Sequence, residues 1–90
     1  MSANSITTGQ QLAEKVGGTF VQSKHYGRIM VGKRTLVYVN PMHLDFKADH
    51  VAKAPKVARA KLTIKGNRAH LPLTDTKAAA TLLGHVAKGA

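Results

Sequence analysis

The chain has no cysteine and no tryptophan, and only four of its 90 residues are aromatic. Without cysteine it forms no disulfide and offers no thiolate to a metal ion. Aromatic rings bury more area than other side chains, so their scarcity predicts a thin core made of aliphatic residues and alanine. A chain without disulfides suits a reducing compartment, and we expect a cytoplasmic location.

Long apolar stretches are also missing. No run approaches the roughly 20 apolar residues that a membrane helix needs, so we expect no membrane contact. Residues 1–11 are polar and lack the charged start and apolar stretch of a secretory signal. Ninety residues usually form one domain. We therefore expect a flexible leader at residues 1–6 and a single domain at residues 7–90.

Acidic residues are scarce as well. Four Asp and Glu stand against 14 Lys and Arg, which gives a formal net charge of +10. Residues 24–68 hold eleven of the basic residues and two aspartates, so nine of the ten net charges lie in the middle half. A field concentrated in this way attracts polyanions. The alternative is that the charge only keeps a small protein in solution.

Two segments at the ends of the chain have the pattern of helices. A cap at Thr7 or Thr8 predicts a helix to Val16, which Gly17-Gly18 ends, although glycine at position 9 weakens its first turn. A cap at Thr74 or Asp75 predicts a second helix to about residue 88.

The sequence between these helices is typical of strands. Strands are predicted at segments 19–23, 28–31, 35–40, 43–47, 61–65 and 68–73, of which 35–40 has the most strand-like composition and 43–47 the cleanest alternation of apolar and polar residues. Gly32-Lys33-Arg34 and Gly66-Asn67 predict tight turns. In segment 49–59, Pro55 limits the helix to a short turn followed by a basic loop. These elements predict an α+β fold: one two-layer domain with an antiparallel sheet of about five strands, an N-terminal helix and a C-terminal helix.

Three short strings stand out in the first half of the chain: Gly27-Arg28, Val31-Gly32-Lys33-Arg34 and Leu44-Asp45-Phe46. With these strings the chain resembles a group of small bacterial luciferase-like domains over roughly residues 9–88. The chain departs from that group at residues 36–40, where such domains carry Gly-His-x-His, and it lacks their tryptophan. The resemblance implies the α+β layout and no chemistry, and light emission is not implied.

The basic middle of the chain is its strongest functional feature. Long cationic side chains at a turn tip, in a loop and along a strand can contact phosphates, and such contacts position a nucleic acid without reading its sequence. We expect Tyr26 and Tyr38 to be core or rim residues, although both could stack on bases. The predicted nucleic-acid-binding residues are Lys33, Arg34, Lys53, Lys56, Arg59, Lys61, Lys65 and Arg68.

Other chemistry has less support in the sequence. His43 with Asp45 is the one plausible acid–base dyad, and no serine lies in a nucleophile elbow. The five histidines have loose spacing for a metal site. The glycine pair 17–18 leads from a helix into a strand, the reverse of a phosphate-binding loop. We therefore expect no enzyme activity, no metal and no cofactor.

The alternative function is a protein-interaction module, which could bind an acidic protein or a second copy of the chain and could derive from a mobile element. A strand edge or the alanine-rich C-terminal helix would supply its surface. Salt separates the two hypotheses, because phosphate contacts weaken steeply with salt while an apolar interface persists.

Overall fold

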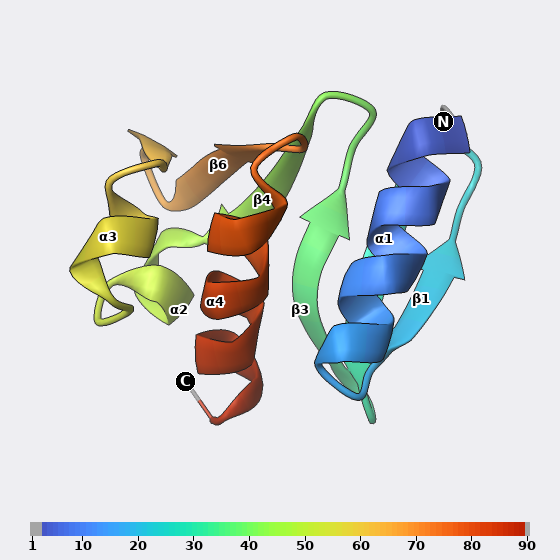
Figure 1. Ribbon diagram of the computed structural model, residues 1–90, viewed down its shortest axis with the longest axis horizontal. Coiled ribbons are helices and arrows are strands. Elements are labelled where there is room, and N and C mark those ends of the chain that lie inside the picture. Colours follow the sequence, from blue (N-terminus) through green and yellow to red (C-terminus); the bar gives the residue numbers. More distant parts are fainter. Residues whose placement is uncertain (1–2, 90) are drawn as a thin grey trace.

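The computed structural model describes residues 3–89, and it contains ten helices and strands within that range (Figure 1). In chain order the elements are α1 (Ala3–Lys15), β1 (Thr19–Gln22), β2 (Gly27–Val31), β3 (Arg34–Val39), β4 (His43–Lys47), α2 (Ala48–Val51), α3 (Lys56–Arg59), β5 (Thr63–Lys65), β6 (Arg68–Pro72) and α4 (Thr76–Ala87).

All strands belong to one antiparallel sheet with the order β1-β2-β3-β4-β6-β5. Gly32 and Gly66 begin the two-residue turns before β3 and β6, and their φ angles are 60° and 61°. Glycine adopts this left-handed conformation without strain. The predicted α+β domain with helices at both ends is confirmed, and the sheet has six strands where about five were expected.

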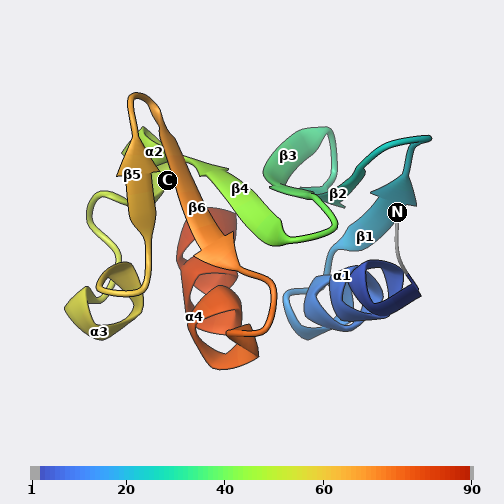
Figure 2. The same ribbon diagram turned by 90° about the horizontal axis from the view of Figure 1, so that it is seen from above.

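The core lies on one side of the sheet. Figure 2 shows α1 and α4 on the same face. In β4 and β6 every second residue is buried, as in a strand with one covered face. The largest buried side chains come from this face and from the two helices: Phe46, Leu12, Ile29, Leu36, Leu44, Leu71, Leu82 and Leu83.

The predicted leader is wrong for residues 3–6, because α1 begins at Ala3; residues 1 and 2 lie outside the described part of the chain. Ser5 is fully buried, and its hydroxyl donates to the backbone oxygen of Pro41 at 3.2 Å. This contact joins the first turn of α1 to the β3–β4 loop. It spans 36 residues, so local sequence patterns give no sign of it.

Gly9 is buried in the middle of α1 and lies against β1. A Cβ atom at this position would come within 2.4 Å of Cε1 of Phe20. Glycine costs a helix roughly 1 kcal/mol relative to alanine. Here it allows the helix backbone to approach the ring, which a methyl group would prevent.

Two contacts fix the ends of α4. The Asp75 carboxylate accepts a hydrogen bond from the backbone N–H of Ala78 at 3.4 Å, in agreement with the predicted cap. At the other end, Nη2 of Arg34 donates to the backbone oxygen of Val86 at 2.7 Å. This places a cation at the negative end of the helix, where it is stabilising.

The segment between β4 and β5 forms two single-turn helices, α2 and α3, on either side of Pro55. Val51, Ala54 and Ala58 are buried and join the core, so the segment is more ordered than the predicted basic loop. Within residues 3–89, every helix falls short of the length and apolar character required to cross a membrane.

The close approach at Gly9 generates a stability prediction. We expect Gly9→Ala to lower the free energy of unfolding by about 1–3 kcal/mol, because overpacking outweighs the gain in helix propensity. Gly84→Ala is the matched control, since Gly84 also lies within a helix, α4, and its Cβ would meet no atom within 4 Å. That control should raise stability by roughly 0.5–1 kcal/mol. Urea unfolding measures both, and equal stabilisation by the two substitutions would contradict this packing.

Candidate nucleic-acid interface

The face of the sheet opposite α1 and α4 remains accessible and carries polar side chains. One row of directly paired residues crosses all six strands: Val21, Arg28, Tyr38, Asp45, His70 and Thr63. Every member is partly or fully exposed. Residues that face each other across an antiparallel pair lie side by side, so the row forms one continuous surface.

A second row on this face is entirely cationic. Lys47 of β4 is paired with Arg68 of β6, and Arg68 is paired in turn with Lys65 of β5. Like charges directly opposite each other destabilise a sheet. Because they are directly paired, the three cations form a concentrated positive strip beside the Asp45–His70 pair, despite this cost.

Asp45 supplies the negative charge within this surface. Its Oδ1 lies 2.9 Å from Nε of Arg68 and 3.6 Å from Nε2 of His70. Arg68 also lies over the Tyr38 ring, 5.7 Å from its centroid, and the Tyr26 and Tyr38 rings pack in a T-shaped arrangement with 5.6 Å between centroids. These contacts hold the Arg68 guanidinium in a fixed orientation on the open face.

Two imidazoles stack at one end of this face. The rings of His43 and His70 lie 4.2 Å apart between centroids with an angle of 27°. Partial burial lowers the pKa of His43 from its ordinary value of 6.5, and the neighbouring His70 and Lys65 lower that pKa further, while Asp45 opposes the shift. His43 therefore stays neutral to a lower pH than a free imidazole.

Arg28 adds another cation in the row beside Tyr38. Among the described residues, its Nε is a buried side-chain nitrogen with no hydrogen-bond partner. A buried donor without an acceptor is unfavourable.

The structure brings together only part of the predicted site. Lys65 and Arg68 lie on the open face and are directly paired. Lys33 is exposed at the tip of the β2–β3 turn. Arg34, the next residue, is engaged by the carbonyl of Val86 at the end of α4. It therefore has a structural partner that the sequence did not indicate.

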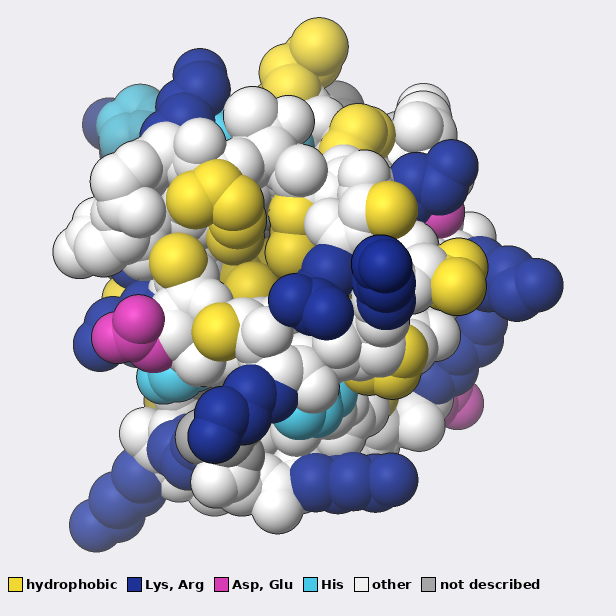
Figure 3. All heavy atoms as spheres, turned by 90° about the vertical axis from the view of Figure 1, so that its left-hand side faces the viewer, with side chains coloured by type: hydrophobic (Ala, Val, Ile, Leu, Met, Phe, Trp, Pro, Cys, Tyr) yellow, Lys and Arg dark blue, Asp and Glu magenta, His cyan; other side chains and the backbone are white. Residues whose placement is uncertain are grey.

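The other predicted residues lie along the α2–α3 segment, which packs against α4. Nη1 of Arg59 donates to the backbone oxygen of Ala52 at 3.1 Å. Lys61 lines a shallow groove with residues of α4, including Lys77. Lys53 and Lys56 are exposed nearby. Figure 3 shows Lys and Arg side chains spread over the side of the molecule formed by α2, α3 and β5, with few acidic side chains between them.

Sequence reasoning missed Lys47 as a site residue and did not foresee the His43–His70 stack. The alternation of β4 did place His43, Asp45 and Lys47 on one polar face. The missing information was the pairing of β4 with β6, which sets these side chains beside Arg68 and His70. The histidine that lies nearest to the Asp45 carboxylate by these distances is His70, at 3.6 Å, and Arg68 contacts the same oxygen at 2.9 Å.

Among residues 3–89, no group of three His, Asp or Glu side chains has an arrangement that could hold a metal ion. No protein-family model, curated protein or solved structure matches the sequence or the fold. The resemblance to luciferase-like domains stays a prediction from the sequence.

The lowered pKa of His43 predicts a pH dependence of stability. The folded state favours the neutral imidazole, so this contribution is complete above the ordinary pKa of 6.5 and is lost as the pH falls through the lowered value. We expect His43→Gln to lose less stability than the unmodified protein between about pH 7.5 and pH 5. Denaturant unfolding at each pH tests this, with His25→Gln as the control for loss of an exposed imidazole. Parallel pH profiles for the unmodified protein and His43→Gln would refute it.

Proposed function

We propose that the protein binds nucleic acid without sequence specificity, through the open face of its sheet. The observation that carries this proposal is the cationic row Lys47–Arg68–Lys65, which adjoins Tyr38 and the stacked histidines on the same surface. Cations contact phosphates, and flat rings accept bases by stacking. In this row and the neighbouring row that contains Tyr38, the carboxylate of Asp45 is the one group that would repel an anionic ligand, and it already forms an ion pair with Arg68.

Single-stranded nucleic acid suits this surface better than a duplex. A sheet that carries rings and cations can accept splayed bases on the rings while the backbone follows the basic residues. Lys53, Lys56, Arg59 and Lys61 lie to one side, along α2 and α3. In this proposal they add long-range attraction to the polyanion, while contact is made on the sheet.

The test is fluorescence anisotropy with a labelled single strand and a labelled duplex, between about 50 and 200 mM salt. We expect a steep fall in affinity with salt. The double variant Lys47→Met, Lys65→Met should reduce the slope of log affinity against log salt by about 1.4 on the single strand, since each phosphate contact contributes roughly 0.7.

The matched control is Lys56→Met, Lys77→Met, which removes the same charge from α3 and α4. It should change the slope by much less than the variant on the sheet. A larger effect from this control would move the interface to the helical side. Failure of the unmodified protein to bind either nucleic acid at low salt would reject nucleic-acid binding, and the charge would then serve solubility.

Asp45 gives a prediction with opposite signs for affinity and stability. Asp45→Asn removes the carboxylate from the open face and frees Arg68 for phosphate, so affinity for the single strand should rise. The same change breaks a partly exposed ion pair and should lower the free energy of unfolding by about 1 kcal/mol. Anisotropy and urea unfolding on one preparation measure both. A fall in affinity would show that Asp45 orients Arg68 for binding and would contradict the expected gain.

A second candidate function is self-association or binding of a protein partner through the β5 side. Val57 and Ile64 there are 83% and 58% exposed, and β5 is an edge strand of the sheet. Unpaired strand edges and exposed apolar side chains favour contact with another chain. Sedimentation at high salt distinguishes this function, because an apolar contact persists when phosphate contacts are screened.

A further inference from the structure

The sheet is split between β3 and β4. The two strands are paired only at Tyr38 with Asp45 and at Val39 with Leu44. In β3 a bulge inserts one extra residue, since Ile29 pairs with Val37 while Met30 pairs with Thr35. A bulge bends its strand. Beyond Asp45, β4 continues beside β6 alone, and a cleft of about 210 Å³ opens between β3 and β4.

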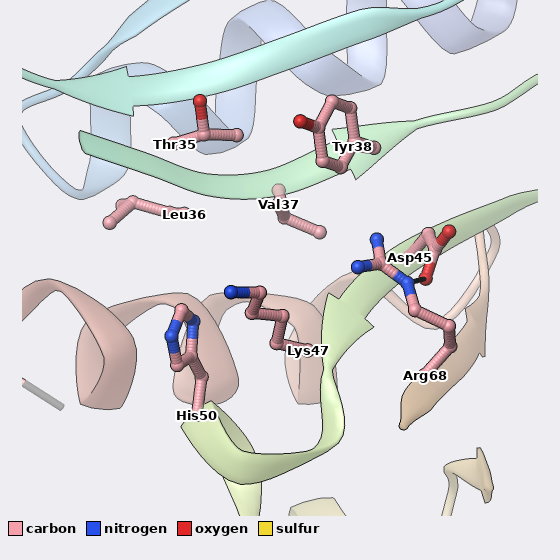
Figure 4. Close-up of a pocket in the computed structure, with 8 residues that line it drawn as sticks. All are labelled: Thr35, Leu36, Val37, Tyr38, Asp45, Lys47, His50 and Arg68. Atoms are coloured by element: carbon pink, nitrogen blue, oxygen red, sulfur yellow. Dashed lines mark hydrogen bonds and ion pairs between the residues drawn. The ribbon is translucent and has the colours of Figure 1, made fainter. Parts of the chain in front are cut away.

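The cleft has an apolar floor and a polar mouth. The floor consists of Leu36 and Val37, which are almost fully buried. Figure 4 shows that the other lining side chains come from four elements and surround the gap: Thr35 and Tyr38 of β3, Asp45 and Lys47 of β4, His50 of α2, and Arg68 of β6. The site is therefore assembled by tertiary structure and cannot be found in any one segment of the sequence.

The charges in this cleft are unbalanced. Asp45 is bonded to Arg68 at 2.9 Å. Lys47 and His50, in contrast, have no ion pair or hydrogen bond among the described residues. The Lys47 ammonium group and the His50 imidazole thus face the cleft without an acidic partner, beside the Arg68 guanidinium. This combination favours an anion with several acceptor oxygens.

We propose that the cleft binds a phosphate group at the end of a nucleic-acid strand. This rests on the proposed function and names the part of the ligand that the cleft would hold. Drug-sized ligands occupy pockets of about 300–1,000 Å³, so this cleft suits a smaller group such as one phosphate with its sugar. A terminal phosphomonoester carries about −1.5 to −2 charges, against −1 for a phosphate within the strand. The Lys47 ammonium group, with the His50 imidazole as a further hydrogen-bonding group, matches the terminal group better.

The experiment compares short single strands of one sequence that end in phosphate or in hydroxyl, at the 5′ end and at the 3′ end. We expect one phosphorylated end to increase affinity by about tenfold, which is the effect of one additional charge-assisted hydrogen bond. The ratio of affinities, phosphorylated to unphosphorylated, is the readout. Lys47→Met and His50→Gln should each bring this ratio close to one, while Lys77→Met on the helical side should preserve it.

Inorganic phosphate tests the cleft independently of strand binding. In NMR titrations it should shift the His50 imidazole signals in the unmodified protein and leave them unchanged in Lys47→Met. Equal affinity for all strand ends, together with no response to phosphate, would overturn the terminal-phosphate site while leaving the proposed function intact. Failure of every strand to bind, with His50 still responding to phosphate, would instead reject the proposed function and retain an anion site in this cleft.

Discussion

The structure depends on burying one face of a six-stranded sheet with only two long helices. A chain of 90 residues with four aromatic side chains cannot build a second covering layer. The buried residues of β4 and β6 therefore lie on the face covered by helices, and the alternate positions must tolerate water. The accessible face is thus a direct consequence of chain length and composition. A ligand can bind to it without any addition to the fold.

The covering layer is kept close to the sheet by small residues and by a few long-range contacts. Gly9 allows α1 to lie against Phe20, and buried alanines on α4 allow that helix to approach the sheet. The Ser5 and Arg34 side chains then join the helices to backbone carbonyls 36 and 52 residues away. With so few large side chains, close approach of the backbone replaces the volume that aromatic rings would supply.

The parts of the fold that local physics controls could be predicted from the sequence. Strand-like composition and alternation located the strands, glycine located the turn at Gly66, and Asp75 marked the start of α4. The start of α1 was missed because Ser5 is held by a distant carbonyl. The split between β3 and β4 was missed for a similar reason. A bulge depends on how neighbouring strands align, which residues 34–39 do not reveal on their own.

The candidate site shows the same division. Each cation in the row Lys47–Arg68–Lys65 occupies a polar position that alternation predicts, but their mutual contact follows from pairing among three strands. The fold requires only polar residues at these positions, and uncharged ones would avoid the repulsion between like charges. Asp45 compensates Arg68 alone. The remaining repulsion is a cost that folding does not explain, whereas a bound polyanion would convert each of these cations into a favourable contact.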